Sequence, residues 1–311
     1  MIRVFVIIIF CTILLYGCNR KGCTDELATN YNAKAKKDDG SCIYPPTTNT
    51  TDSEPKDTTY IITNIPATQQ KVVLLEEFTG VYCYTCPLGH MVTDSLIDEY
   101  PDQLAVLNIH STYYGIYDDP NVMGNAYDFR TADNDTIVSM LGGIISVPSG
   151  AIDRTIANGE NQIITQKRYR WREYFQDRIS EIPPVNIAIV TDFNDTTRNL
   201  QVVVTLTYTE AQASANYLNL VITEDKIVDK QYVDTVVVND YEHPHILRDV
   251  LTEVRGEPIN TTIEVGRVYI RVFNYTVPEN WNTQNIELVS FVHAKESFWS
   301  VLQAATQKIE N

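Results

Sequence analysis

Cys83 and Cys86 are two thiols separated by two residues, and they follow the apolar run at residues 72–75. Thiol–disulfide exchange uses such a pair, because one thiolate attacks a disulfide and a nearby second thiol then attacks the mixed disulfide. A helix that begins at Cys83 would stabilise its thiolate through unpaired N–H groups and the positive end of the helix dipole. Zinc half-sites share this spacing, so the pair by itself leaves metal binding open.

Strands and a helix are expected around the two cysteines. The run at 72–75 is typical of a buried strand, and residues 104–110 predict a second one. A helix follows Cys83 with Pro87 in its first turn, where a missing N–H costs little. Its buried face is expected to carry the apolar residues Leu88, Met91, Val92, Leu96 and Tyr100. Pro148 stands at the start of another strand, a position usual for a cis peptide bond or a turn.

This order of elements is that of thioredoxin, and residues 71–183 resemble a thioredoxin-like domain. The whole chain resembles the outer-membrane protein 28 family, which are lipoproteins of the diderm cell envelope. The motifs that carry the resemblance are Glu76-Glu77-Phe78-Thr79-Gly80 before the cysteines, Val147-Pro148-Ser149, and the terminal runs 291–293 and 301–305. The expected fold is therefore an α/β thioredoxin-like domain followed by an all-β immunoglobulin-like sandwich, with a small N-terminal disulfide module before them.

The resemblance implies a role for each of four residues. Cys83 is the nucleophile and Cys86 the resolving thiol, and the two form a disulfide when oxidised. Thioredoxins carry a buried acid six residues before the nucleophile, and Glu77 occupies that position, from which it would accept the proton of Cys86. Pro148 would border the groove for an extended substrate peptide. The dipeptide Tyr84-Thr85 matches neither the reductase nor the strong-oxidant pattern, so the direction of the reaction stays open.

Residues 1–17 form a lipoprotein signal peptide. Arg3 is their only charge, and the apolar stretch from Val4 to Leu15 is too short to span a bilayer. The sequence Leu15-Tyr16-Gly17-Cys18 resembles a bacterial lipobox, in which the cysteine is acylated, as with palmitate, and becomes the new N-terminus. Asn19 is not the aspartate that favours inner-membrane retention, so we expect an anchor in the outer membrane, on its periplasmic or its surface face.

Residues 18–44 hold the lipidated N-terminus and a segment that resembles a small disulfide module of secreted and surface proteins, in which Cys23 pairs with Cys42. Its Asp and Asn side chains could bind Ca²⁺. Turn residues are the better-supported interpretation, because the EF-hand spacing with its terminal Glu is absent. Residues 45–70 are a Pro- and Thr-rich linker and lead-in, which lets the redox domain stand off the membrane.

The chain is strongly acidic. It contains 24 Lys and Arg against 40 Asp and Glu, a formal net charge of −16 at pH 7. This charge argues against nucleic acid or anionic lipid headgroups as partners. It favours solubility beside a membrane.

Two further segments frame the thiol pair in the sequence. The insertion at 111–143 is rich in Tyr and Asp, and it is either a lid that contacts substrate or a cover for exposed core. A helical pattern at 162–182 ends at Pro183-Pro184, and residues 184–311 then alternate apolar and polar positions, as the strands of a β-sandwich do. We therefore place a domain boundary at Pro183-Pro184 and expect two separately folding units.

The predicted function is thiol–disulfide exchange on disulfide-bearing envelope proteins, with no cofactor beyond the thiol pair. A non-catalytic surface scaffold or binding lipoprotein is the first alternative, because a fold does not fix a function. The second is copper handling, in which Cys83, Cys86 and His90 share Cu(I). His243 and His245 also have a metal-like spacing, but Pro244 interrupts the strand, and ordinary hydrogen bonds of a loop are the favoured interpretation.

We predict that the mature protein begins at an acylated Cys18. Two or more acyl chains would hold it stably in the outer membrane, whereas a single chain gives only marginal binding. Mass spectrometry of the N-terminal peptide tests this. An unmodified peptide that starts at another residue would contradict it.

Overall fold

The computed structural model describes residues 20–24, 32–37, 58–143, 146–294 and 299–309. The chain divides into two compact units, residues 1–53 and 54–311. In the first unit, a parallel bridge joins Lys21 to Lys37, and Asn32 N donates a hydrogen bond to Cys23 O. Cys23 is buried and disulfide-bonded. The predicted sites Cys18 and Cys42 lie outside the described residues.

The second unit contains a four-stranded antiparallel sheet. Its strands are, in spatial order, β1 (Thr58–Ile61), β12 (Arg267–Thr276), β6 (Asn199–Tyr208) and β5 (Val185–Asn194). In β6 every second residue from Leu200 to Tyr208 is buried, and the residues between them are at least partly exposed. The period of two that the sequence shows here therefore places one face of the sheet on a core, as predicted.

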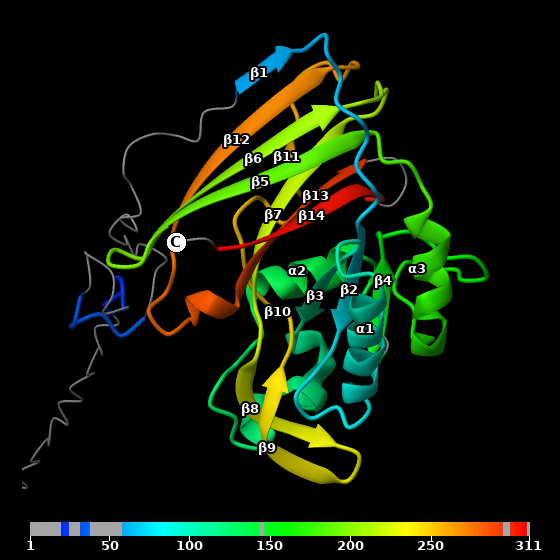
Figure 1. Ribbon diagram of the computed structural model, residues 1–311. Helices are drawn as coiled ribbons and strands as arrows, with labels where there is room; N and C mark the ends of the chain where they lie inside the picture. Colours follow the sequence, from blue (N-terminus) through cyan, green and yellow to red (C-terminus); the bar gives the residue numbers. More distant parts are fainter. Residues whose placement is uncertain (1–19, 25–31, 38–57, 144–145, 295–298, 310–311) are drawn as a thin grey trace, which may run out of the picture. The chain divides into compact units, whose positions relative to one another are not determined.

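A larger mixed sheet lies beside it and runs through the whole second unit (Figure 1). Its spatial order is β14 (Val301–Lys308), β13 (Ile286–Ala294), β7 (Asn216–Glu224), β10 (Ile246–Val250), β3 (Leu104–Ile109), β2 (Val73–Phe78) and β4 (Ser149–Ile152), with β11 (Glu257–Pro258) paired to β7. The β10–β3 and β3–β2 pairs are parallel, and the other pairs are antiparallel. Buried side chains of β5, β6 and β12 pack against those of β7 and β13. The unit is thus mostly β, with mixed sheets and a sandwich core.

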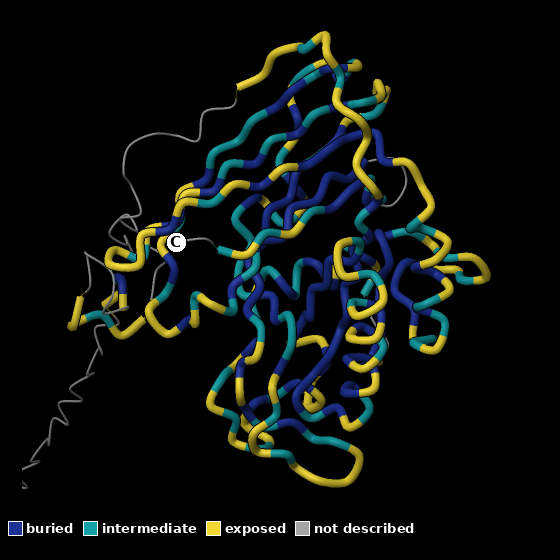
Figure 2. Tube along the Cα trace, viewed as in Figure 1, coloured by how far each residue is buried: buried dark blue, intermediate teal, exposed yellow. Residues whose placement is uncertain are grey.

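Three α-helices cover the part of the large sheet that contains β2 and β3. They are α1 (Pro87–Glu99), α2 (Ala132–Met140) and α3 (Trp171–Ile179). The unit also contains short 3-10 helices, which are η1 (Thr112–Asp118), η2 (Pro120–Val122), η3 (Arg168–Arg170) and η4 (Thr283–Asn285). Val73 and Leu75 of β2 pack with residues of α1 and α3, whereas Leu74 and Phe78 pack with residues of α2 and β13. Both faces of β2 are therefore buried, and Figure 2 shows much of the interior of the second unit in the colour of buried residues.

The buried face of α1 is not the one that the apolar pattern predicts. Its buried residues are Pro87, Gly89, His90, Thr93 and Leu96. Leu88 and Met91 are 41% and 64% exposed, so the prediction is wrong for these two positions. The physical reason is that α1 packs small and polar residues against polar side chains of β2 and the loop after it.

The helical pattern at 162–182 also extends further than the helix. Only Trp171–Ile179 form α3, because Thr165 pairs with Gly150 of β4 through two backbone hydrogen bonds and is held in an extended segment. Ile163 and Ile164 are buried in the core around α2. Pairing with the sheet therefore overrides the local helical pattern at these positions.

A two-stranded hairpin, β8 (Ile227–Val233) and β9 (Val236–His243), forms a separate small sheet. Figure 1 shows it at the end of the unit where α1 begins, away from β5, β6 and β12. Within the residues that the structure describes, no helix is long and apolar enough to cross a membrane.

The sequence boundary at Pro183-Pro184 does not coincide with a division between sheets. Strands from both sides of it share the large sheet, and β10 pairs with both β3 and β7. One core around α2 contains Leu107 and Ile137 from before the boundary, together with Phe291 from after it.

We expect fragments 58–183 and 184–311 to lack cooperative thermal unfolding when they are expressed separately, because each would expose this shared core and an unpaired strand edge. Circular dichroism of the two fragments and of 58–311 measures this. A sharp transition in both fragments would support the separately folding units that the sequence predicts.

Candidate functional site

The two cysteines lie where β2 gives way to α1. β2 ends at Phe78, a loop follows, and Cys86 is the N-cap of α1 with Pro87 as the first helical residue. The helix therefore begins later than the predicted start at Cys83, which lies in the turn before it, because Cys86 N bonds to Cys83 O. Cys83 and Cys86 are joined by a disulfide, with their Cα atoms 5.3 Å apart. Both are buried, with 2% and 0% of their surface exposed.

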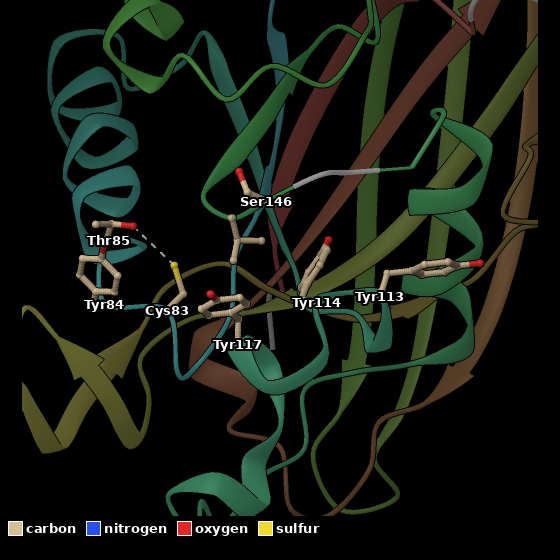
Figure 3. A pocket seen from close by; sticks show the side chains of 8 residues that line it. Cys83, Tyr84, Thr85, Tyr113, Tyr114, Tyr117 and Ser146 are labelled. Atoms are coloured by element: carbon tan, nitrogen blue, oxygen red, sulfur yellow. Dashed lines mark hydrogen bonds between the residues drawn. The ribbon is translucent and has the colours of Figure 1, made fainter.

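An open groove of about 350 Å³ reaches Cys83. It is lined by Cys83, Tyr84, Thr85, Tyr113, Tyr114, Tyr117, Ser146 and Val147. In Figure 3, the first three come from the loop before α1 and the three tyrosines come from η1. Cys86 is not among the lining residues, so Cys83 is the sulfur that an incoming group can approach. The Val147–Pro148 peptide bond beside the groove is cis.

Glu77 points from β2 toward the first turns of α1. A β-carbon at Gly89 would collide with Oε1 of Glu77, and it would lie 3.4 Å from the β-carbon of Pro148. Glycine at position 89 therefore allows α1 to approach the carboxyl group of Glu77 and the ring of Pro148 closely. Neither carboxyl oxygen of Glu77 has a hydrogen-bond partner of ordinary geometry among the described residues. Burial, and then the charge of Asp94, raise the pKa of Glu77 well above its usual value.

His90 lies beside Glu77, with Nε2 3.8 Å from Oε1. Its Nε2 is 3.1 Å from Thr79 Oγ1, and its Nδ1 is 2.6 Å from the hydroxyl of Tyr241 in β9. Burial is the main cause that lowers the pKa of His90 well below its usual value, and it also raises that of Tyr241. The imidazole is therefore neutral at neutral pH, and both of its nitrogens are engaged.

The insertion at 111–143 both lines the groove and fills the core. Tyr117 O accepts a hydrogen bond from Tyr82 N, and Asp118 Oδ1 accepts one from Val81 N, so η1 holds the loop that leads to Cys83. Phe129 instead packs in a buried cluster with β8 and β10. The part of the insertion in η1 therefore lines the groove, and the part around Phe129 covers the core.

The β8–β9 hairpin supplies site residues that the sequence analysis missed. Gln231 Nε2 donates to Gly80 O and Cys83 O, and the ring of Tyr232 stacks on that of Tyr82 at 4.9 Å. Gln231 is separated by 148 residues from Cys83, and no spacing in the sequence links them. The sequence around Gln231 indicates at most a polar residue in a short strand, and it does not indicate which residue that side chain contacts.

The hydrogen bonds of the His243-Pro244-His245 motif come from its backbone. The expectation that its imidazoles make ordinary hydrogen bonds in a loop is wrong for His243, which ends β9 and whose ring nitrogens have no hydrogen-bond partner of ordinary geometry among the described residues. Pro244 O accepts from Asn108 Nδ2, and His245 O accepts from Asn108 N. Burial is the largest cause that lowers the pKa of His243 to about 3. The described residues contain no group of three or more His, Cys, Asp or Glu side chains placed to hold a metal ion.

A family model for the outer membrane protein Omp28 matches residues 140–311. The fold is similar to that of HBP35 of Porphyromonas gingivalis, with 17% identity, a TM-score of 0.56, and coverage of 77% of this chain and 76% of that one. A domain of the outer membrane lipoprotein Omp28 from Porphyromonas gingivalis also matches, with 20% identity, a TM-score of 0.30, and coverage of 42% of this chain and 91% of that one. Among curated proteins, none matches significantly.

The raised pKa of Glu77 predicts how stability depends on pH. The folded protein keeps a proton on Glu77 that the unfolded chain releases above about pH 4.5. The contribution of Glu77 to the free energy of unfolding is therefore fully present below that pH, and it is lost as the pH rises through the pKa of Glu77 in the folded protein. We expect Glu77→Gln to gain stability relative to wild type with rising pH, by up to about 1.4 kcal/mol per pH unit in this interval.

Urea unfolding between about pH 5 and about pH 8 measures the difference. Glu210→Gln removes the charge of an exposed glutamate and is the matched control. A difference between Glu77→Gln and wild type that stays constant over this range would contradict the raised pKa.

Proposed function

The chain belongs to the outer membrane protein Omp28 family, whose members are outer-membrane lipoproteins, and from this premise we propose that it exchanges disulfides with cell-envelope proteins. The observation that carries the proposal is the Cys83–Cys86 disulfide at the start of α1, with Cys83 lining an open groove and Cys86 behind it. Helix N-termini stabilise thiolates, which are the reactive form in exchange.

The order and pairing of the strands and helix within residues 71–183 support this function. β2 and β3 are parallel neighbours joined through α1, and β4 pairs antiparallel with the other edge of β2. Glu77 and Pro148 both contact the Gly89 region of α1, close in sequence to Cys86. The four residues that the resemblance selects therefore gather around one helix start.

In the direction that oxidises a substrate dithiol, the reaction starts from the Cys83–Cys86 disulfide. A substrate thiolate attacks Cys83 Sγ, and Cys86 leaves as a thiolate that takes up a proton. A second substrate thiolate then attacks the first substrate sulfur, and Cys83 leaves as a thiolate. Two electrons pass from the substrate dithiol to the cysteine pair, and the reverse sequence reduces a substrate disulfide.

Glu77 is the group that we assign to the Cys86 proton. A carboxyl group with a raised pKa keeps its proton to a higher pH than an exposed carboxyl group does, and it can give that proton to the leaving Cys86 thiolate and take it back in the reverse direction. Neutral His90 beside it adds no positive charge that would lower the pKa of the acid.

Anchoring at Cys18 is part of the proposal. Residues 58–61 of the expected linker form β1, so the linker of the proposal is limited to residues 45–57. Acyl chains on Cys18 and this linker would place the groove in the envelope beside the outer membrane, where disulfide-bearing proteins are the substrates. Copper handling receives less support than exchange, because both nitrogens of His90 are engaged by Thr79 and Tyr241.

The test is a trapping experiment in cells that express the full-length protein. In Cys86→Ser the resolving thiol is absent, so we expect disulfide-linked complexes through Cys83 on non-reducing gels, and none in Cys83→Ser. The purified wild-type protein should also reduce a model protein disulfide faster than a free dithiol does, or oxidise the corresponding protein dithiol faster than a free disulfide does. If no complexes are trapped and no such rate is found, the non-catalytic scaffold function replaces the exchange function.

A further inference from the structure

The β8–β9 hairpin is attached to the loop that carries Cys83. Tyr232 N donates to Val81 O at 2.9 Å, and Asp234 N donates to Tyr84 O at 3.2 Å. The stacked rings of Tyr82 and Tyr232 add a side-chain contact between the same two segments. The hairpin therefore adjoins the loop on both sides of Cys83 in the sequence.

Gln231 is the side chain at the centre of this contact. It is fully buried, and its Nε2 lies 3.2 Å from Gly80 O and 3.1 Å from Cys83 O, with Tyr232 O a third acceptor at 3.2 Å. The same two loop carbonyls also accept the backbone bonds that shape the loop, from Cys83 N to Gly80 O and from Cys86 N to Cys83 O. One carboxamide thus bridges two consecutive turns that contain both cysteines.

We propose that Gln231 is a positioning residue through which the C-terminal half of the chain sets the reactivity of the Cys83–Cys86 pair. It does not contact substrate. The amide hydrogens of this buried side chain carry partial positive charge and lie next to the carbonyl oxygen of Cys83. Positive charge near Cys83 stabilises its thiolate more than it stabilises the neutral disulfide. It therefore favours the reduced form of the pair and lowers the pKa of the Cys83 thiol.

The inference rests on the proposed function and deepens it, but its measurement requires only equilibration of the cysteine pair with glutathione and no exchange with a protein substrate. The readouts are the reduction potential of the pair in glutathione buffers and the pH dependence of Cys83 alkylation in the reduced full-length protein. A variant that merely loosens the fold would lower the unfolding midpoint without shifting either value in a fixed direction.

Gln231→Met keeps the length of the side chain and removes its donors. We expect about a fivefold shift of the glutathione equilibrium toward the disulfide, which corresponds to a potential lower by about 20 mV, together with a slower alkylation of Cys83 at neutral pH. Gln201→Leu is the control, because it removes a glutamine amide that bonds to Asn274 in the four-stranded sheet, and it should leave both values unchanged. Should Gln231→Met fail to fold, Gln231→Leu replaces it.

The inference is overturned if the folded Gln231 variant has the same reduction potential and the same alkylation profile as wild type. This holds whether or not the protein exchanges disulfides with protein substrates. A shift toward the reduced form would overturn it as well. If the wild-type protein exchanges no disulfide with protein substrates while the Gln231 variant shows the expected shift in the glutathione equilibrium, the proposed function fails and the positioning role of Gln231 stands.

Discussion

The hydrogen bonds of Asn108 join the two parts of the large sheet. At the end of β3, its backbone N–H donates to His245 O and its side-chain Nδ2 donates to Pro244 O, both at 2.8 Å. These bonds seat β10 beside β3, and β10 pairs with β7 along its other edge. A buried strand edge with unpaired N–H and C=O groups is costly, and this junction pairs the edge of β3 that β2 leaves open. The β8–β9 hairpin directly precedes β10 in the chain, so its place near the cysteines depends on the same junction.

The interior around α1 holds more polar groups than a core built for stability alone. Glu77 and His90 are both buried, and burial moves their pKa values in the directions that keep each group neutral. Keeping them neutral avoids the much larger cost of two buried charges. A neutral carboxyl group with a raised pKa is also what proton transfer to and from a thiol requires. The cost in stability and the proposed chemistry thus have one cause, which is the exclusion of water from this side of β2.

The cysteine loop leads directly into α1 and is also held by two segments that are far from it in the chain. η1 contributes Asp118 and the carbonyl of Tyr117, the hairpin contributes Gln231, and α1 begins at the loop itself. Gly80 fits only because it lacks a β-carbon, which would collide with the Tyr117 carbonyl oxygen. Such close support from outside the β2–α1–β3 segment restricts the positions that the two sulfurs can take. The C-terminal half therefore contributes directly to the surroundings of the Cys83–Cys86 disulfide.

The sequence alone determined the features that depend on local pattern. The Cys83-Tyr84-Thr85-Cys86-Pro87 run, the apolar runs of β2 and β3, and the alternation in β5, β6 and β12 each predicted an element that the structure contains. The tertiary structure alone decided which face of α1 is buried, since Leu88 and Met91 are exposed where Gly89 and His90 pack on Glu77 and Thr79. It also decided that one sheet crosses Pro183-Pro184 and that Gln231 reaches Cys83. The physical reason is that periodicity reports which residues of one segment share a face, whereas the partner of that face is fixed by pairing between distant strands.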